Sequence, residues 1–254
     1  MKIIIMGTGA SQGVPIIGCN CDVCSSTDER DKRMRPSVIV QKDNTTLLID
    51  ASPDLRTQLL KFYNKRDIKA VLLTHEHRDH VAGLDDLRPI IFSQKKPMDI
   101  YGLQRTLDAL KCLFFYSFEQ DLYPGAPQFN LHYIDNKEFI IGGITVIPIK
   151  LMHYKMEIRG YRINNFAYIT DAKYIPQSDM KKLKNLDVLI INALRRKVHY
   201  SHFNLEEALE IIDELKPRKA FLTHIGHFLG KHSELLKELP DNVEPAYDGM
   251  LIEV

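Results

Sequence analysis

Four apolar segments of this 254-residue sequence each end in a histidine or an aspartate. Short apolar runs of this kind are typical of buried strands. Strands that end on one rim of a sheet can bring their final residues to a common point. Imidazole and carboxylate groups suit zinc, manganese or iron. The pattern therefore predicts a metal centre built from the residues that close these segments, which are His75, His153, Asp171 and His224.

The first of these endings continues over residues 75–80 as HEHRDH. Residues i and i+2 of an extended chain project to the same side, so His75 and His77 can hold one cation. If the chain turns after them, Asp79 and His80 can hold a second cation. Two divalent cations about 3.5–4 Å apart activate water as a nucleophile at neutral pH, which predicts a hydrolase.

The string from Thr74 to His80 resembles the H-x-H-x-D-H signature of the metallo-β-lactamase superfamily, and the later endings look like its remaining ligands in the same order. This resemblance implies an α+β fold, the αββα sandwich, with residues 1–254 forming a single domain. It gives Asp79 a catalytic role besides ligation, since its second carboxylate oxygen can orient the nucleophile. β-Lactamases of this fold lack the complete pattern with a histidine at the position of His80, which argues against antibiotic hydrolysis. By this resemblance His75, His77 and His153 hold one metal, Asp79, His80 and His224 hold the other, and Asp171 bridges the two.

Three cysteines lie within six residues near the start of the chain. Thiolates select zinc, and a structural zinc normally has four ligands, so this triad needs one more. The candidates are Cys112 and a distant histidine. We favour His227 because it lies three residues after His224, whereas Cys112 lies in an apolar run and is expected to pack as a small hydrophobe. The predicted zinc-binding loop covers residues 18–24, with the ligands Cys19, Cys21, Cys24 and His227.

Motifs near the start of the chain restrict the resemblance to a subgroup of this superfamily. The motifs G-T-G at residues 7–9, Q-G-V-P at residues 12–15 and C-x-C-x-x-C are similar to those of PhnP-type phosphodiesterases. Those enzymes open phosphoribosyl cyclic phosphate and carry a structural zinc with three cysteines and one histidine. The same opening occurs in PqqB-like proteins of quinone-cofactor biosynthesis. RNase Z is a third relative, but the short stretch between His153 and Asp171 leaves no room for its tRNA-binding arm.

Two histidines lie in the segment HYSHFN, at residues 199–204, just before a predicted helix. The resemblance implies that His202 lies over the substrate phosphate, where an imidazolium would stabilise negative charge and protonate the leaving oxygen. His199 is the competing candidate. The sequence thus predicts a phosphodiesterase of small cyclic or sugar phosphodiesters with two divalent metals, manganese or zinc with iron as an alternative. Other hydrolases of this fold, a PqqB-like protein and, with least support, RNase Z are the alternatives.

Composition limits the remaining possibilities. The chain is 44% hydrophobic, which suffices for a sizeable core and argues against disorder. Its net charge of +1 argues against nucleic acid as a partner. No stretch approaches the ~18 apolar residues of a membrane span, and the initial apolar run is too short for a signal peptide. Four cysteines, three of them clustered, do not indicate a disulfide framework, so we expect a cytoplasmic protein. A homodimer is implied by the resemblance only.

Two blocks of strands with helices between them are expected to position these groups. A hairpin turn is predicted at Asp43-Asn44. The first block is expected at Lys2–Met6, Ser37–Gln41, Thr46–Ile49, Ala70–Thr74 and Met98–Tyr101, and the second at Glu138–Ile141, Ile144–Ile149, Phe166–Thr170, Asp187–Asn192, Ala220–Thr223 and Met250–Val254.

Two helices carry clear start signals. One is predicted over Asp54–Tyr63, after Ser52 and a proline. The other is predicted over Leu205–Leu215, because Asn204 and Glu207 form a capping-box pattern ahead of an apolar stripe. The aromatic-rich residues 103–130 are expected to form core or an interface rather than a substrate lid. His132 and His232 show no partner pattern, and we expect both at the surface.

Overall fold

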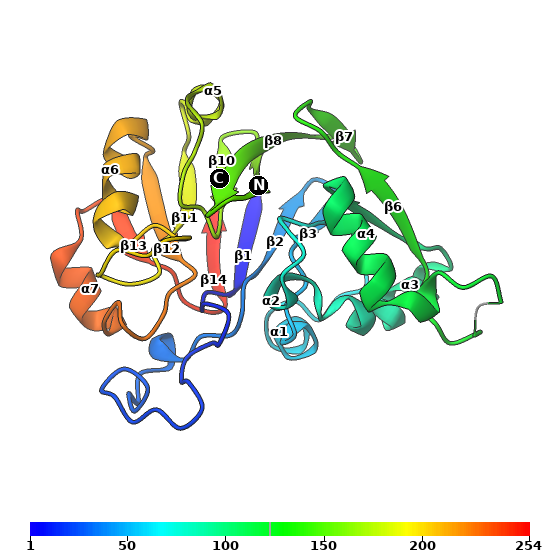
Figure 1. Cartoon of the computed structure of the whole chain (residues 1–254), viewed down its shortest axis with the longest axis horizontal. Helices are drawn as coiled ribbons and strands as arrows, with labels where there is room; N and C mark the ends of the chain where they lie inside the picture. The colour runs from blue at the N-terminus through cyan, green and yellow to red at the C-terminus, as the bar shows by residue number, and fades with distance from the viewer. Residues whose placement is uncertain (122) are drawn as a thin grey trace.

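The computed structural model describes residues 1–121 and 123–254. In this part of the chain, two seven-stranded sheets face each other, with helices on both outer sides (Figure 1). The first sheet has the order β14 (Met250–Glu253), β1 (Lys2–Gly7), β2 (Ser37–Lys42), β3 (Thr45–Ile49), β4 (Ile68–Leu72), β5 (Met98–Gly102) and β6 (Phe129–Tyr133). The second has the order β13 (Val243–Pro245), β12 (Lys219–Thr223), β11 (Val188–Asn192), β10 (Phe166–Ile169), β9 (Met156–Ile163), β8 (Ile144–His153) and β7 (Phe139–Ile141).

The helices lie on the outer faces of the two sheets. Those that pack on the first sheet are α1 (Leu55–Phe62), α2 (Arg78–Val81), α3 (Arg88–Gln94) and α4 (Gln104–Leu113). Those that pack on the second are α5 (Gln177–Met180), α6 (Leu205–Leu215) and α7 (His232–Glu238). Short 3-10 turns occupy Glu29–Asp31, Leu84–Leu87, Phe115–Ser117 and Lys181–Leu183. The described helices include none that is both long and apolar enough to cross a bilayer.

Three apolar clusters account for this layering. The middle cluster lies between the sheets, where Leu72 and Val40 of the first sheet share one core with Tyr168 and Ile190 of the second. A second cluster packs the first sheet against its helices, and a third packs the second sheet against α5, α6 and α7. Helices, sheet, sheet and helices in this order are the αββα sandwich, so the predicted α+β fold class is confirmed.

The direction of the strands decides where their ends lie. Strands β3, β4, β5 and β6 pair in parallel, as do β10, β11, β12 and β13. Strand β8 runs the same way as β10, because both pair antiparallel with β9. The carboxyl ends of β8, β10, β11 and β12 therefore lie at one edge of the second sheet.

The predicted hairpin turn and the predicted start of the helix at Leu205 are both confirmed. The hairpin between β2 and β3 turns at Asp43, whose φ is 52°. Helix α6 begins with a complete capping box, because Asn204 Oδ1 accepts the Glu207 N–H at 3.0 Å and Glu207 Oε2 accepts the Asn204 N–H at 3.0 Å. The first predicted helix is one residue shorter at each end.

One predicted strand lies in the other sheet, and three strands of the structure, β6, β9 and β13, are absent from the prediction. Strand β14, which the sequence pattern places with the second block, pairs with β1 and so belongs to the first sheet. Strand β9 is absent from the prediction because it carries a charged residue, Arg159, at a buried position. Its guanidinium lies 2.8 Å from Glu157 and donates to Asn136 at 2.9 Å, so the charge is compensated.

Residues 103–130 divide between core and surface; position 122 lies outside the described residues. Phe114 and Phe129 are buried in the outer core of the first sheet, whereas Phe115 and Tyr123 are exposed. The aromatic stretch therefore supplies core as expected, and it also leaves two large rings in solvent.

The prediction that His132 and His232 lie at the surface is wrong for His232. His132 is partly exposed and lies 2.8 Å from Asp99. His232 is 2% exposed, because it begins α7 against the loop between β1 and β2, where Asp31 accepts its backbone N–H at 2.7 Å. A helix start is commonly exposed, and the long loop that covers this one leaves no pattern in the local sequence.

Candidate metal centre and active site

Residues that end strands gather where the edges of the two sheets meet. His75 follows β4, His153 ends β8, Asp171 follows β10 and His224 follows β12. Two of them, Asp171 and His224, adopt the left-handed backbone conformation, with φ of 56° and 52°. Non-glycine residues adopt this conformation rarely, with Asp, Asn and His several-fold enriched. The turn at each strand end thus aims a polar side chain back over the edge of the sheet.

The loop after β4 turns so that the remaining residues of the HEHRDH string lie near His75. Helix α2 begins at Arg78, and His80 donates its backbone N–H to the His77 carbonyl at 2.9 Å. This turn places the ring of His80 4.2 Å, between centroids, from that of His75. The rings of His75, His77 and His153 are also neighbours, with centroids 4.6, 5.1 and 5.6 Å apart. The structure thus brings together the residues that the sequence singled out.

Asp171 lies in the middle of this group. Its Oδ2 is 3.2 Å from His80 Nε2 and 3.2 Å from His224 Nδ1. Asp79 Oδ2 lies 3.3 Å from the same nitrogen of His80. Asp79, His80, Asp171 and His224 are all buried, and their ligand atoms lie within 4.8 Å of one another.

Unpartnered nitrogens show that this group fits a divalent cation. His75 Nε2 is buried and has no partner among the described residues. His80 Nε2 and His224 Nδ1 are also buried, and they approach the carboxylate of Asp171 at 3.2 Å without the geometry of a hydrogen bond. A buried polar atom without a partner is costly unless something else satisfies it. Imidazole nitrogens and carboxylate oxygens that face one point are the donor set that zinc, manganese and iron accept.

For two residues of the centre, His224 and Asp171, the pKa shift favours the deprotonated state that binds metal. Burial lowers the pKa of His224 to about 4, so its imidazole is neutral. Burial by itself would raise the pKa of Asp171, but the charge of His80 and the hydrogen bond from His202 outweigh it and hold the pKa well below its usual range. Metal ligands must be deprotonated, so both residues need little rearrangement to bind a cation.

Asp50 is a functional residue that the sequence interpretation missed. It follows β3 with φ of 58°, and its carboxylate lies 2.7 Å from His80 Nδ1. The same carboxylate accepts the Thr74 N–H at 2.9 Å. A partner on the far nitrogen of a ligating histidine fixes the ring and its tautomer. The signal was present, because the apolar segment Leu47–Ile49 also ends in an aspartate.

His202 lies at the edge of the group, on the side of Asp171. Its Nε2 is 3.0 Å from Asp171 Oδ1, and its ring lies 4.7 Å from that of His153 and 5.0 Å from that of His224. His199 is one step further out, with its Nδ1 3.2 Å from the Nδ1 of His202. Of the two histidines, His202 therefore lies next to the candidate metal ligands, and His199 contacts it from outside.

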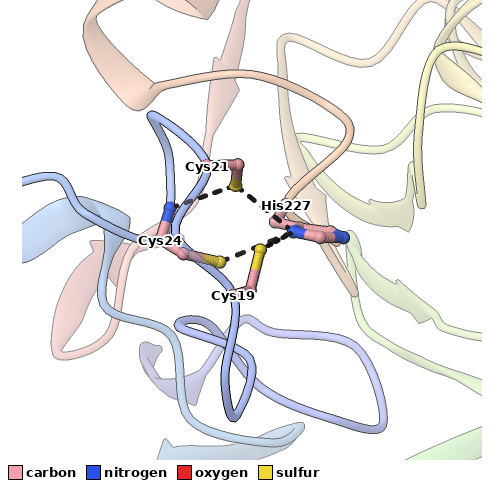
Figure 2. Close-up of side chains that lie close together, drawn as sticks. All are labelled: Cys19, Cys21, Cys24 and His227. Atoms are coloured by element: carbon pink, nitrogen blue, oxygen red, sulfur yellow. Dashed lines mark hydrogen bonds between the residues drawn. The ribbon is translucent and has the colours of Figure 1, made fainter.

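The cysteine triad has its own partner histidine. In Figure 2 the sulfurs of the three cysteines point toward one nitrogen of the same imidazole, and the Sγ atoms lie 3.4, 3.4 and 3.5 Å from His227 Nδ1. Cys112 lies elsewhere and is exposed on α4, so the prediction that it packs as a small hydrophobe is wrong. The apolar residues of that run, such as Leu110, face the core instead. The Cys24 amide donates to the sulfur of Cys21 and lowers its pKa to about 6, which favours a thiolate. Three sulfurs and one nitrogen are a zinc ligand set, and the residues grouped here are Cys19, Cys21, Cys24 and His227.

Comparison with known proteins agrees with the geometry. The family model of the β-lactamase superfamily domain matches residues 45–225, which include the HEHRDH loop, His153, Asp171 and His224. The chain belongs to the metallo-β-lactamase superfamily. Members of this superfamily are mostly hydrolases and typically bind divalent metals.

Three similar proteins illustrate the range of relatives. A solved diphosphatase from the PhnP family shares 38% identity and a TM-score of 0.93, with 100% of this chain and 97% of that chain covered. Zinc-bound PqqB from Methylobacterium extorquens has a TM-score of 0.81 at 21% identity, covers 100% of both chains and shows the fold alone. An octanoyltransferase of Porphyromonas gingivalis (strain W83) is 40% identical over 98% of this chain, which spans 51% of that protein.

A pocket of about 400 Å³ opens beside the candidate metal centre, next to His77 and His153. Two cations border it. Lys155 is exposed, and Arg105 forms an ion pair with Glu76 of the HEHRDH loop. Two exposed tyrosines, Tyr154 and Tyr200, lie on the same rim with ring centroids 5.7 Å apart. None of these four rim residues was singled out from the sequence, because each lies in a loop or at a helix start without a motif.

Proposed function

We propose that the chain is a hydrolase of small phosphodiesters that uses two divalent metals, held by the seven residues predicted from the sequence. The observation that carries the proposal is the position of His202, whose Nε2 lies 3.0 Å from Asp171, the carboxylate proposed to bridge the two metals. A proton donor beside a two-metal centre suits a reaction in which an alkoxide leaves. The 38% identity to a PhnP-family diphosphatase supports a phosphorus centre as the point of attack.

The side chains around the centre have distinct tasks in this proposal. The metals, when bound, supply activation of water and neutralise phosphoryl charge. Asp79 orients the attacking water through its second carboxylate oxygen. His202 donates a proton to the oxygen that leaves phosphorus. Lys155 and Arg105 attract the anionic substrate to the pocket beside His77.

A second set of ligands completes the proposed metal content. Cys19, Cys21, Cys24 and His227 hold one zinc that has a structural task, because no open position remains once four ligands are in place. This zinc ties the loop between β1 and β2 to the segment that follows His224. Manganese, zinc and iron stay alternatives at the two-metal centre. A single domain, a cytoplasmic location and a homodimer also stay predictions.

Hydrolysis of a diphosphate is the second candidate, because a solved relative with 97% of its chain covered is named a diphosphatase. The attacked atom is again phosphorus, and the same residues would act on it. The name octanoyltransferase belongs to a protein about twice as long as this chain, so an acyl ester or thioester is retained as a comparison substrate.

The test is a substrate comparison on the purified chain loaded with manganese or zinc. Bis-p-nitrophenyl phosphate and a ribose cyclic phosphate represent phosphodiesters, ADP represents diphosphates, and an aryl ester with an octanoyl thioester represents acyl compounds. We expect the phosphodiesters to be cleaved with the highest kcat/KM, and Asp171→Asn to abolish the activity. Preferred cleavage of ADP would support the second candidate. Preferred cleavage of an acyl substrate would overturn the assignment to phosphorus chemistry.

A further inference from the structure

Ser201 lies at the meeting point of three histidines. The residue is 4% exposed, and its Oγ is 3.0 Å from His202 Nδ1 and 3.2 Å from His199 Nδ1. Its carbonyl oxygen lies 3.0 Å from His153 Nδ1. One residue therefore contacts a predicted metal ligand through its backbone and two further imidazoles through its side chain.

The backbone amide of Ser201 decides the direction of these hydrogen bonds. Its N–H donates to His199 Nδ1 at 3.3 Å, so that nitrogen is an acceptor and carries no proton. His202 Nδ1 lies 3.2 Å from the same nitrogen. Two lone pairs facing each other at this distance would repel, so His202 Nδ1 carries the proton. The chain then runs from His202 Nδ1–H to Ser201 Oγ. The Ser201 hydroxyl donates in turn to His199 Nδ1, whose lone pair it shares with the Ser201 backbone N–H.

We propose that His199, acting through the hydroxyl of Ser201, is a positioning residue for His202. The hydrogen-bond chain holds Nδ1 of His202 on the outer side of the ring and turns Nε2 toward Asp171, at 3.0 Å. This inference rests on the proposed function, in which His202 Nε2–H gives its proton to the leaving oxygen. In that step the N–H bond at Nε2 breaks and an O–H bond forms, while the proton on Nδ1 stays in place.

The surroundings of His199 keep its ring from turning away. The ring of Tyr200 stacks on it, with centroids 4.4 Å apart and planes at 27°. Tyr200 in turn contacts Tyr154 edge to face on the rim of the pocket. His199 itself is separated from Asp171 by the whole ring of His202, so it acts on the reaction only through its neighbours.

Three variants test the hydrogen-bond chain. His199→Phe keeps a flat ring against Tyr200 and removes the acceptor, Ser201→Ala removes the hydroxyl, and His199→Asn restores an acceptor near the position of Nδ1. Each is assayed on two phosphodiesters, one that releases nitrophenolate and one that releases an alkoxide. A misplaced proton donor matters for the poor leaving group and little for the good one.

We expect His199→Phe and Ser201→Ala to lower kcat on the alkoxide substrate by about tenfold or more, with KM and metal content unchanged. Their effect on the nitrophenyl substrate should be under about twofold, and His199→Asn should recover most of the loss. The double variant should be no worse than Ser201→Ala, because both act in one chain. Equal losses on both substrates, a loss of metal or no loss at all would overturn the inference.

A measurement without turnover separates this inference from the proposed function. In the zinc-loaded chain labelled with ¹⁵N-histidine, NMR should show a proton on Nδ1 of His202 and none on Nδ1 of His199. That pattern in a chain that cleaves no phosphodiester would reject the function and retain the hydrogen-bond chain. If the chain is active and His202 Nδ1 carries no proton, the positioning role is rejected and the proposed function is retained.

Discussion

Asp50 Oδ2 lies 2.7 Å from His80 Nδ1, and both side chains are completely buried. The contact leaves only the opposite nitrogen of His80 to face Asp171 and Asp79. Asp50, which is not itself a candidate metal ligand, therefore fixes the orientation of the His80 ring. Burial raises the pKa of Asp50, while His80 and the Thr74 amide work against that rise, so its charge depends on these partners.

Removing Asp50 should weaken metal binding at the centre. We expect Asp50→Ala to lower the affinity for zinc by about 10–100-fold, because His80 loses the partner that fixes its ring. Titration of metal-free protein against a chromophoric chelator measures the change. Asp99→Ala is the matched control, since it removes an aspartate 2.8 Å from a histidine at a partly exposed site. Wild-type affinity in a folded Asp50→Ala chain would contradict the prediction.

Elemental analysis should separate the two metal sites. The wild-type chain is expected to hold about three metals, and Cys21→Ser about two, because one thiolate is lost from a four-ligand zinc site. Cys112→Ser should retain about three, since Cys112 is exposed on α4 away from the cluster. If Cys21→Ser and Cys112→Ser held the same amount of metal as wild type, the cysteine cluster would not be a zinc site.

Loss of His202 should affect turnover and spare the metals. We expect His202→Ala to lower kcat on an alkoxide-releasing phosphodiester by roughly 10²–10³, because the leaving oxygen loses its proton donor. Metal content, measured on the same preparation, should stay at the wild-type value. A variant that loses metal would instead make His202 a ligand, which its grouping with His153 and Asp171 allows geometrically.

The buried His232 should make stability depend on pH. Burial, followed by the charge of Arg33, lowers the pKa of His232 to about 4. Between the unfolded value near 6.5 and this lowered value, the unfolded chain binds a proton that the folded chain does not, so stability falls as the pH falls. His232→Phe cannot take up that proton. Relative to this variant, the wild type should lose about 2 kcal/mol of unfolding free energy between about pH 7 and about pH 5.

Urea unfolding at the two pH values, on metal-free protein, provides that comparison. Metal-free samples are needed because acid also releases metals from the centre. A constant difference between wild type and His232→Phe would show that His232 takes up its proton equally well in the folded chain.

Several candidate ligands were accessible from the sequence because they repeat one simple relationship, an apolar strand followed by a histidine or an aspartate. His75, Asp171 and His224 follow this rule, and parallel strands bring such ends to one edge. The same rule applied to Asp50 would have found it. Asp50 differs from the other strand-end residues because its carboxylate contacts the far nitrogen of His80 and does not face the point where the ligand atoms meet.

Other features depend on contacts between distant parts of the chain. The burial of His232 follows from the loop that reaches it through Asp31, about two hundred positions earlier. Strand β9 contains Arg159, which is acceptable inside a sheet only because Glu157 and Asn136 lie beside it. The direction of the hydrogen bonds at Ser201 follows from a backbone amide, which carries no sequence signal.

The left-handed backbone at Asp171 and His224 restricts which amino acids these two positions accept. Metal chemistry alone would admit glutamate or cysteine as well as aspartate and histidine. The backbone conformation favours glycine, asparagine, aspartate and histidine. Only aspartate and histidine belong to both groups. A glutamate at Asp171 would keep the charge but strain the turn, so the geometry of the main chain narrows the choice of ligand to two residue types.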